Sequence, residues 1–201
     1  QAQHKEDSLR RREVEILLAE LYGKKHSIHQ TWRLDHKGEE FEQYIFEKFG
    51  KKCFNCKKVM ASSKEQALDH TRALANLWPL DEYATCLCSS CNGSKSAKPP
   101  SEFYSESQLT ELAEITGLSL DEIKSNNVNI DALKKLSENV VWFFDKFLAK
   151  KELQKKRDGK LTADNIYRSI EELVRKVNMP DLLEKYRAIT GHNPTTITTE
   201  D

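Results

Sequence analysis

The sequence predicts an α+β, mostly helical fold, in which a small cysteine-containing core is flanked by an N-terminal helical segment and a C-terminal helical bundle. Of the 201 residues, 32% are charged and 38% are hydrophobic, with only seven Gly and five Pro. This composition is typical of helix-rich globular proteins and excludes collagen-like or disordered chains. All five Cys lie between Cys53 and Cys91, where no helical period is visible. These observations divide the chain into segments 1–50, 51–104 and 105–201.

The N-terminal segment, residues 1–50, is predicted to form two helices. Apolar residues of the first helix recur at helical spacing, at Val14, Leu17, Leu18 and Leu21. Gly23 ends this pattern, and a second helix runs through Phe41 and Ile45 to Gly50.

The middle segment, residues 51–104, contains only short apolar runs, which favour strands over long helices. We expect two short strands, over residues 66–69 (QALD) and 85–88 (TCLC). Pro99 and Pro100 close the segment because neither continues a helix easily.

The C-terminal segment, residues 105–201, is predicted to be a run of helices. Two capping boxes mark helix starts, SESQ at residues 105–108 and SLDE at residues 119–122. Each places an oxygen-bearing side chain where it satisfies the free amides of a first helical turn.

The rest of this segment carries three further helix signals. One apolar face extends over residues 130–157 and predicts a long helix that ends at Asp158-Gly159. Thr162 is expected to cap the next helix, and a last short helix is expected over residues 180–191. The tail, residues 193–201, is expected to fray.

The chain shows no sign of a membrane or export segment. No run of about 18 apolar residues is present. Residues 1–12 are polar and lack the apolar centre of a signal peptide. These features predict a soluble, cytoplasmic protein, and in a reducing compartment clustered Cys indicate a metal site rather than disulfides.

Four of the five Cys form two Cys-x-x-Cys pairs, Cys53 with Cys56 and Cys88 with Cys91, separated by thirty-one residues. Two residues between thiols allow one tight turn to present both sulfurs to one ion, and two such knuckles complete a tetrahedral Zn²⁺ site. A closed four-sulfur site leaves no open coordination position, so this zinc is expected to be structural. Cys86 is the fifth thiol, and its apolar neighbours indicate a core position.

Polar residues that could carry catalysis lie between the two knuckles and just after the second one. Asp69-His70 follows the first predicted strand, and Asn92 and Lys95 follow the second knuckle. One carboxylate and one amide oxygen form a sparse, hard ligand set that suits Mg²⁺, which keeps waters and takes phosphate oxygens. A nearby His can take a proton from water, and a Lys can hold a phosphate as a point charge.

In this order, Cys-x-x-Cys, Asp-His and Leu-Cys-x-x-Cys-Asn-x-x-Lys, the segment resembles the HNH nuclease family with its ββα-metal fold. The resemblance covers about a quarter of the chain, roughly residues 53–104. It implies that His70 is the general base, that Asp69 and Asn92 hold one catalytic Mg²⁺, for which Mn²⁺ can substitute, and that the four paired Cys hold structural zinc. It also implies that Lys95 lies near the scissile phosphate or packs under it.

One position departs from the family pattern. The Asn that usually orients the catalytic His would fall at Tyr83, and the nearest Asn is Asn76. Asn76, the loop backbone or another side chain therefore takes that role. The loop passes through Trp78-Pro79-Leu80 and is similar to loops of some HNH restriction endonucleases.

The formal charge of zero conceals a basic centre. Residues 51–100 hold eight basic and four acidic residues, a difference of +4, whereas residues 1–50 and 101–201 are mildly acidic. A basic centre fits a phosphate polymer. Arg72 and Lys98 are candidate phosphate contacts or solvated charges. Three histidines outside the centre are interpreted as loop or DNA-facing residues: His26, His29 and His36.

The predicted function is a metal-dependent DNA endonuclease, with a type II restriction endonuclease as the first choice. The partner is double-stranded DNA, and cutting both strands with one active site per chain would require a homodimer. The alternatives are another HNH nuclease (homing, phage-defence or modification-dependent) and a non-catalytic zinc module that binds nucleic acid.

Overall fold

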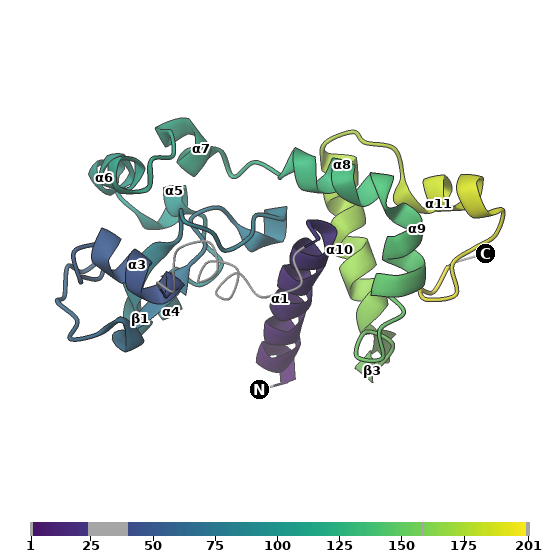
Figure 1. Cartoon of the computed structure of the whole chain (residues 1–201), viewed down its shortest axis with the longest axis horizontal. Helices are drawn as coiled ribbons and strands as arrows, with labels where there is room; N and C mark the ends of the chain where they lie inside the picture. The colour runs from purple at the N-terminus through teal and green to yellow at the C-terminus, as the bar shows by residue number, and fades with distance from the viewer. Residues whose placement is uncertain (1, 24–39, 158, 200–201) are drawn as a thin grey trace. The chain divides into compact units, whose positions relative to one another are not determined.

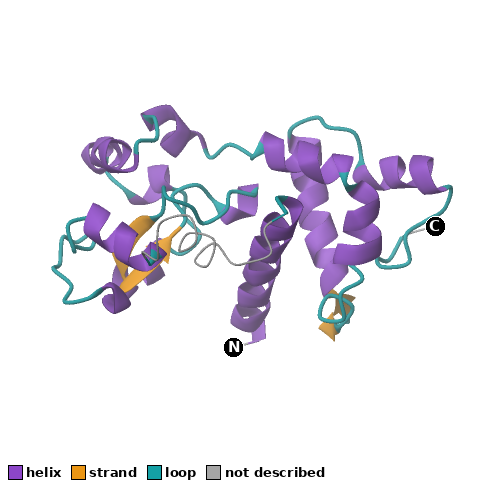
Figure 2. Ribbon diagram, viewed as in Figure 1, coloured by secondary structure: helices purple, strands orange, loops and turns teal. Residues whose placement is uncertain are grey.

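The computed structural model describes residues 2–23, 40–157 and 159–199 (Figures 1 and 2). His26, His29 and His36 lie outside the described residues. The chain forms two compact units, which we call the cysteine unit (residues 23–127) and the helical unit (residues 1–22 and 128–201).

A two-stranded sheet and one helix form the centre of the cysteine unit. Strands β1 (Gln66–Asp69) and β2 (Thr85–Cys88) are antiparallel and lie where the sequence predicts them. Gln66 pairs with Cys88 and Asp69 pairs with Thr85. Helix α4 (Ser89–Lys95) begins directly after β2 and packs on both strands. The order is therefore strand, strand, helix.

Short helices surround this centre: α3 (Phe41–Lys48), η1 (Ser63–Glu65), η2 (Leu74–Asn76), α5 (Pro100–Phe103), α6 (Glu106–Thr116) and α7 (Leu120–Ser125). The apolar faces of α3, α5, α6 and α7 share one core with β2, which includes Phe41, Ile45, Phe54, Leu87, Leu109, Leu112 and Ile123. Both predicted capping boxes are confirmed. The hydroxyls of Ser105 and Ser119 each accept a hydrogen bond from the backbone N–H of the third helical residue, and the side chain of that residue accepts one from the backbone N–H of the serine.

In the described residues of the helical unit, six helical segments pack around a second core. The segments are α1 (Ala2–Leu21), α8 (Ile130–Glu138), α9 (Val140–Trp142), the π-helical turn η3 (Phe143–Phe147), α10 (Thr162–Lys176) and α11 (Leu182–Thr190). Buried side chains come from all of them, among them Leu17, Leu133, Leu136, Val140, Phe143, Phe144, Ile166, Ile170 and Tyr186. The apolar faces predicted for this region are thus confirmed.

The single helix predicted over residues 130–157 is wrong. It breaks into α8, α9 and η3, and the chain then leaves the helix. The carbonyl of Leu148, which a continuing helix would use, accepts a hydrogen bond from the Gln154 side chain at 2.7 Å. Strands β3 (Lys156–Arg157) and β4 (Lys160–Leu161) then form a small hairpin, with Gly159 in its turn at φ +81°.

Two further expectations in the helical unit are also corrected. Thr162 does not cap α10: it is the first helical residue, and its hydroxyl donates to the carbonyl of Lys155 at 3.4 Å. The described part of the tail does not fray. The hydroxyl of Thr196 donates to Phe144, and Thr198 donates its N–H and hydroxyl to the buried carboxylate of Asp164.

The fold class is confirmed in its coarse form: the described part of the chain is mostly helical α+β, with two small antiparallel sheets. The contacts group α5, α6 and α7 with the cysteine segment, and α1 with the C-terminal helices. The three-segment division does not anticipate this grouping. Within the described residues, every helix is too short or too polar to span a membrane.

Candidate metal centre and catalytic groups

The four paired Cys come together in space. The sulfurs of Cys53, Cys56, Cys88 and Cys91 all lie within 4.8 Å of one another. Tetrahedral Zn²⁺ with bonds of about 2.3 Å places its sulfurs about 3.8 Å apart, and the Sγ atoms of Cys56 and Cys88 are 3.9 Å apart. The donor set and its size therefore fit a zinc ion.

Backbone hydrogen bonds shape the first knuckle. The N–H of Lys57 donates to the carbonyl of Cys53, and the N–H of Cys53 donates to the carbonyl of Lys58, each at 2.9 Å. Lys57 adopts the left-handed conformation, with φ +61°, that closes this turn. The N–H of Phe54 donates to the carbonyl of Cys86 at 2.8 Å, which ties the knuckle to β2.

The second knuckle is the junction between β2 and α4. Cys88 is the residue before the helix, and Cys91 lies in its first turn. A hydrogen bond from the backbone N–H of Cys91 lowers the pKa of Cys88 to about 7. Burial raises the pKa of Cys91 to about 12 and also raises the pKa of Cys53. Burial therefore opposes the thiolate form of both groups, whereas a bound cation would favour it, so metal binding should release protons.

Cys86 lies outside this ligand group. Its side chain is fully buried, and burial raises its pKa to about 12. It is a core thiol, as the sequence predicts. On the solvent side, a shallow depression of about 480 Å³ is lined in part by Cys56, Lys58, Cys88 and Ser89, which leaves a path for ions and chelators.

The candidate catalytic groups lie at the end of β1, directly after β1, and on α4. Asp69 is the last residue of β1, and the half-buried His70 follows it. The Nζ atom of Lys95, at the end of α4, is 2.8 Å from Oδ2 of Asp69. Asn92 precedes Lys95 by three positions, so both lie on the same face of α4. Because Lys95 on this face pairs with Asp69, the face is directed toward the end of β1.

The environment of Lys95 differs from that of a phosphate-contacting lysine. Its side chain is 4% exposed, and that of Asp69 is 9% exposed. Of the two positions that the HNH resemblance allows for Lys95, packing under the site agrees better with this burial. Lys98, three residues later, is exposed.

The loop after His70 is held by contacts that the sequence does not predict. The hydroxyl of the buried Thr71 donates to the carbonyl of Tyr83 and lies 2.6 Å from the hydroxyl of Thr85. Because Thr71 is the next residue after His70, these bonds fix the backbone beside the imidazole to the start of β2.

Arg72 is engaged within the same loop. Its guanidinium lies over the rings of Trp78 and Tyr83, 3.9 and 4.8 Å from their centroids, and it donates to Asp81 at 2.6 Å. Burial raises the pKa of Asp81, and the adjacent guanidinium opposes that shift. Arg72 thus holds the loop together, and its side chain is only 15% exposed.

The two residues proposed to orient His70 also have partners in the structure. The side-chain amide of Asn76 donates to the carbonyl and the side-chain oxygen of Asn126, at 2.8 and 2.7 Å. Tyr83 accepts from Thr71 through its backbone and contacts Arg72 through its ring. The identity of the residue that orients His70 stays a prediction.

Among the described residues, the cysteine cluster is the one group of three or more His, Cys, Asp or Glu side chains placed to hold a metal ion. No protein-family model, curated protein sequence or solved structure matches this chain. The geometry of the site and the motifs in the sequence are therefore the basis for assigning a function.

Proposed function

We propose that this chain is a metal-dependent DNA endonuclease of the HNH type and acts as a type II restriction endonuclease. The observation that carries the proposal is the β1–β2–α4 arrangement beside the four-cysteine cluster, with Asp69-His70 at the end of β1 and Asn92 on α4. These residues could supply the general base and the oxygen ligands for phosphodiester hydrolysis with a divalent ion.

In this proposal His70 accepts a proton from the water that attacks phosphorus. Asp69 and Asn92 would hold Mg²⁺, which supplies positive charge to the phosphate and to the leaving 3′ oxygen. Lys95 orients the carboxylate of Asp69 through the 2.8 Å ion pair. A rigid loop after His70 limits the movement of the base, and Thr71 supplies part of that rigidity.

Exposed cations of the basic segment, residues 51–100, would contact the DNA backbone, and Lys98 is one of them. Such contacts make binding salt-dependent. Double-strand cleavage by a single active site per chain calls for a homodimer on the duplex.

A second candidate is a zinc module that binds nucleic acid without cutting it. The specific observation in its favour is the buried ion pair, because Lys95 already neutralises the carboxylate that a divalent ion would need. Under that alternative the zinc cluster and the basic charge remain functional, whereas His70 has no catalytic role.

The test is cleavage of supercoiled plasmid DNA in Mg²⁺ or Mn²⁺ by three forms of the full chain. The parent should nick or linearise the plasmid, and His70→Ala should lower the rate by a factor of about 10²–10⁴, the usual contribution of a general base. His192→Ala is the matched control, because His192 is an exposed histidine of the helical unit. Binding without cleavage by the parent would favour the non-catalytic module.

A further inference from the structure

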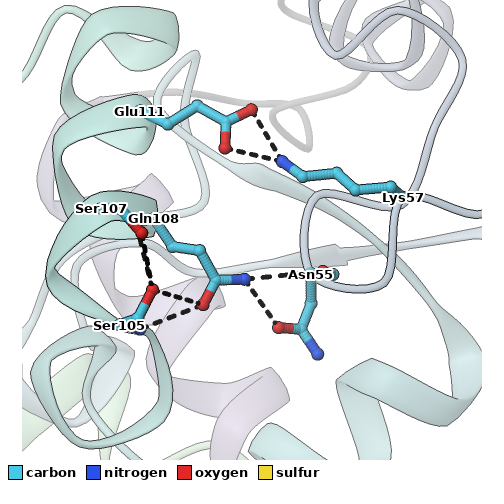
Figure 3. Close-up of polar contacts among 6 residues, drawn as sticks. All are labelled: Asn55, Lys57, Ser105, Ser107, Gln108 and Glu111. Atoms are coloured by element: carbon cyan, nitrogen blue, oxygen red, sulfur yellow. Dashed lines mark hydrogen bonds and ion pairs between the residues drawn. The ribbon is translucent and has the colours of Figure 1, made fainter.

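Helix α6 contacts the first zinc knuckle through two side chains on one face, Gln108 and Glu111 (Figure 3). The Nε2 atom of Gln108 donates to the side-chain oxygen of Asn55 at 3.1 Å. Both carboxylate oxygens of Glu111 accept from Lys57 at 2.7 Å. Asn55 and Lys57 flank Cys56, so this helix face contacts both sides of a metal ligand.

The hydrogen bonds through Gln108 have a defined direction. The backbone N–H of Ser105 can only donate, and it donates to Oε1 of Gln108 at 3.0 Å. The other end of the Gln108 amide, Nε2, must therefore donate to Asn55. Because the oxygen of Asn55 is then the acceptor, its Nδ2 is the group that points to Sγ of Cys91, at 3.4 Å.

We propose that Gln108 is a positioning residue for the metal centre and that it acts through Asn55. The capping box of α6 orients Gln108, Gln108 orients the amide of Asn55, and Asn55 donates a hydrogen bond to the Cys91 sulfur. Such a donor fixes the position of the sulfur and stabilises the negative charge that a sulfur carries as a zinc ligand. Groups that hydrogen-bond to metal ligands in this way commonly change metal affinity by about 10- to 100-fold.

The contact between Lys57 and Glu111 has a different character. Both side chains are about half exposed, 49% and 44%, and exposed ion pairs contribute little to stability. This pair helps to locate the knuckle against α6, but it makes no contact with sulfur. The relay through Gln108 and Asn55 is therefore the part that should set metal affinity.

Gln108→Glu tests the relay without removing the helix cap. Glutamate at this position can still accept from Ser105, as Glu122 does from Ser119 in the capping box of α7. It cannot donate to Asn55, whose amide would then turn its oxygen toward Cys91. The matched control is the reverse exchange, Glu122→Gln, in a capping box whose glutamate makes no described contact with the cysteine cluster.

The measurement is the zinc dissociation constant of the full-length chain, obtained by competition with a chromophoric chelator. Gln108→Glu and Asn55→Ala should each weaken binding about tenfold, whereas Glu122→Gln should match the parent. The double variant should bind as weakly as Asn55→Ala alone, because Gln108 acts through Asn55. In the Co²⁺-loaded protein, both single variants should also shift the sulfur-to-metal charge-transfer band, which a purely structural role would not do.

Parent-like zinc affinity in Gln108→Glu would overturn the relay, and so would fully additive losses in the double variant. The inference depends on the metal centre described above, and the experiment separates the two failures. A parent chain that binds no zinc would refute the centre itself. A parent chain that binds zinc, with variants that bind it equally well, would refute the relay alone.

Discussion

The buried ion pair between Lys95 and Asp69 makes a quantitative prediction about stability. Lys95→Met removes the charge that faces Asp69 and keeps a long unbranched side chain. The two charged atoms are 2.8 Å apart, and the residues are 3% and 8% exposed. At an effective dielectric constant of about 20, the attraction at this distance is about 6 kcal/mol before desolvation is counted. Removal of one partner of such a pair typically costs about 3–5 kcal/mol.

We therefore expect Lys95→Met to lower the free energy of unfolding of the cysteine unit by at least about 3 kcal/mol. The double variant Asp69→Asn, Lys95→Met should recover most of this loss, because the amide at position 69 needs no counter-charge. Hydrogen exchange of peptides from β1 and α4 reports the local free energy of opening in each form. A single variant within about 0.5 kcal/mol of the parent, or a double variant no more stable than the single one, would refute this reasoning.

Three further predictions concern other parts of the molecule. A strong chelator should abolish hydrogen-exchange protection in residues 40–127, because the four sulfurs join the two knuckles through the metal. The helical unit should stay protected by its own core. Unchanged protection in both units would contradict the zinc centre. Burial, followed by the nearby Asp181, raises the pKa of Glu171 to about 7. The protonated form of Glu171 therefore contributes stability that is complete below about pH 4.5, the pKa of an unfolded Glu, and that is lost as the pH rises through 7. Glu171→Gln should therefore raise the free energy of unfolding by about 2–3 kcal/mol more at pH 8.5 than at pH 5, as measured by urea denaturation, and an effect independent of pH would refute that cause. Thr71→Val should lower the free energy of unfolding by about 1–3 kcal/mol in the same assay, because the carbonyl of Tyr83 and the hydroxyl of Thr85 lose a buried partner. An unchanged free energy of unfolding would show that these two hydrogen bonds do not stabilise the loop.

Local sequence signals predicted much of the cysteine unit. The strands at residues 66–69 and 85–88 and the capping boxes at Ser105 and Ser119 each depend on neighbours within four positions, so the sequence contains the whole signal. The Cys-x-x-Cys spacing likewise determines most of the knuckle geometry.

Features that depend on distant partners were not predictable in this way. Beyond η3, the side chain of Gln154 donates a hydrogen bond to the carbonyl of Leu148, which a continuing helix would use. The helix therefore stops, although the apolar period continues to that point. The C-terminal tail is ordered by Asp164, thirty-four positions before Thr198. Both contacts arise from the tertiary packing of polar side chains that have no periodic pattern.

The candidate site shows the same division. Cys53, Cys56, Cys88 and Cys91 meet as their spacing predicts. By contrast, the stacking of Arg72 on Trp78 and Tyr83 depends on how the loop folds back. The sequence marks Gln108 as a capping residue, but only the packing of α6 against the knuckle shows that its amide also reaches Asn55.

The central claim is that Asp69, His70 and Asn92 hydrolyse phosphodiester bonds, and the ends of the cleaved DNA test it most directly. Linear duplex DNA is incubated with the parent and with His70→Ala in Mg²⁺, and both product termini are sequenced and assayed for phosphate. Attack by water with a leaving 3′ oxygen predicts 3′-hydroxyl and 5′-phosphate ends, at discrete positions, in the parent reaction only. Intact DNA, 5′-hydroxyl ends or equal cleavage by His70→Ala would contradict the account.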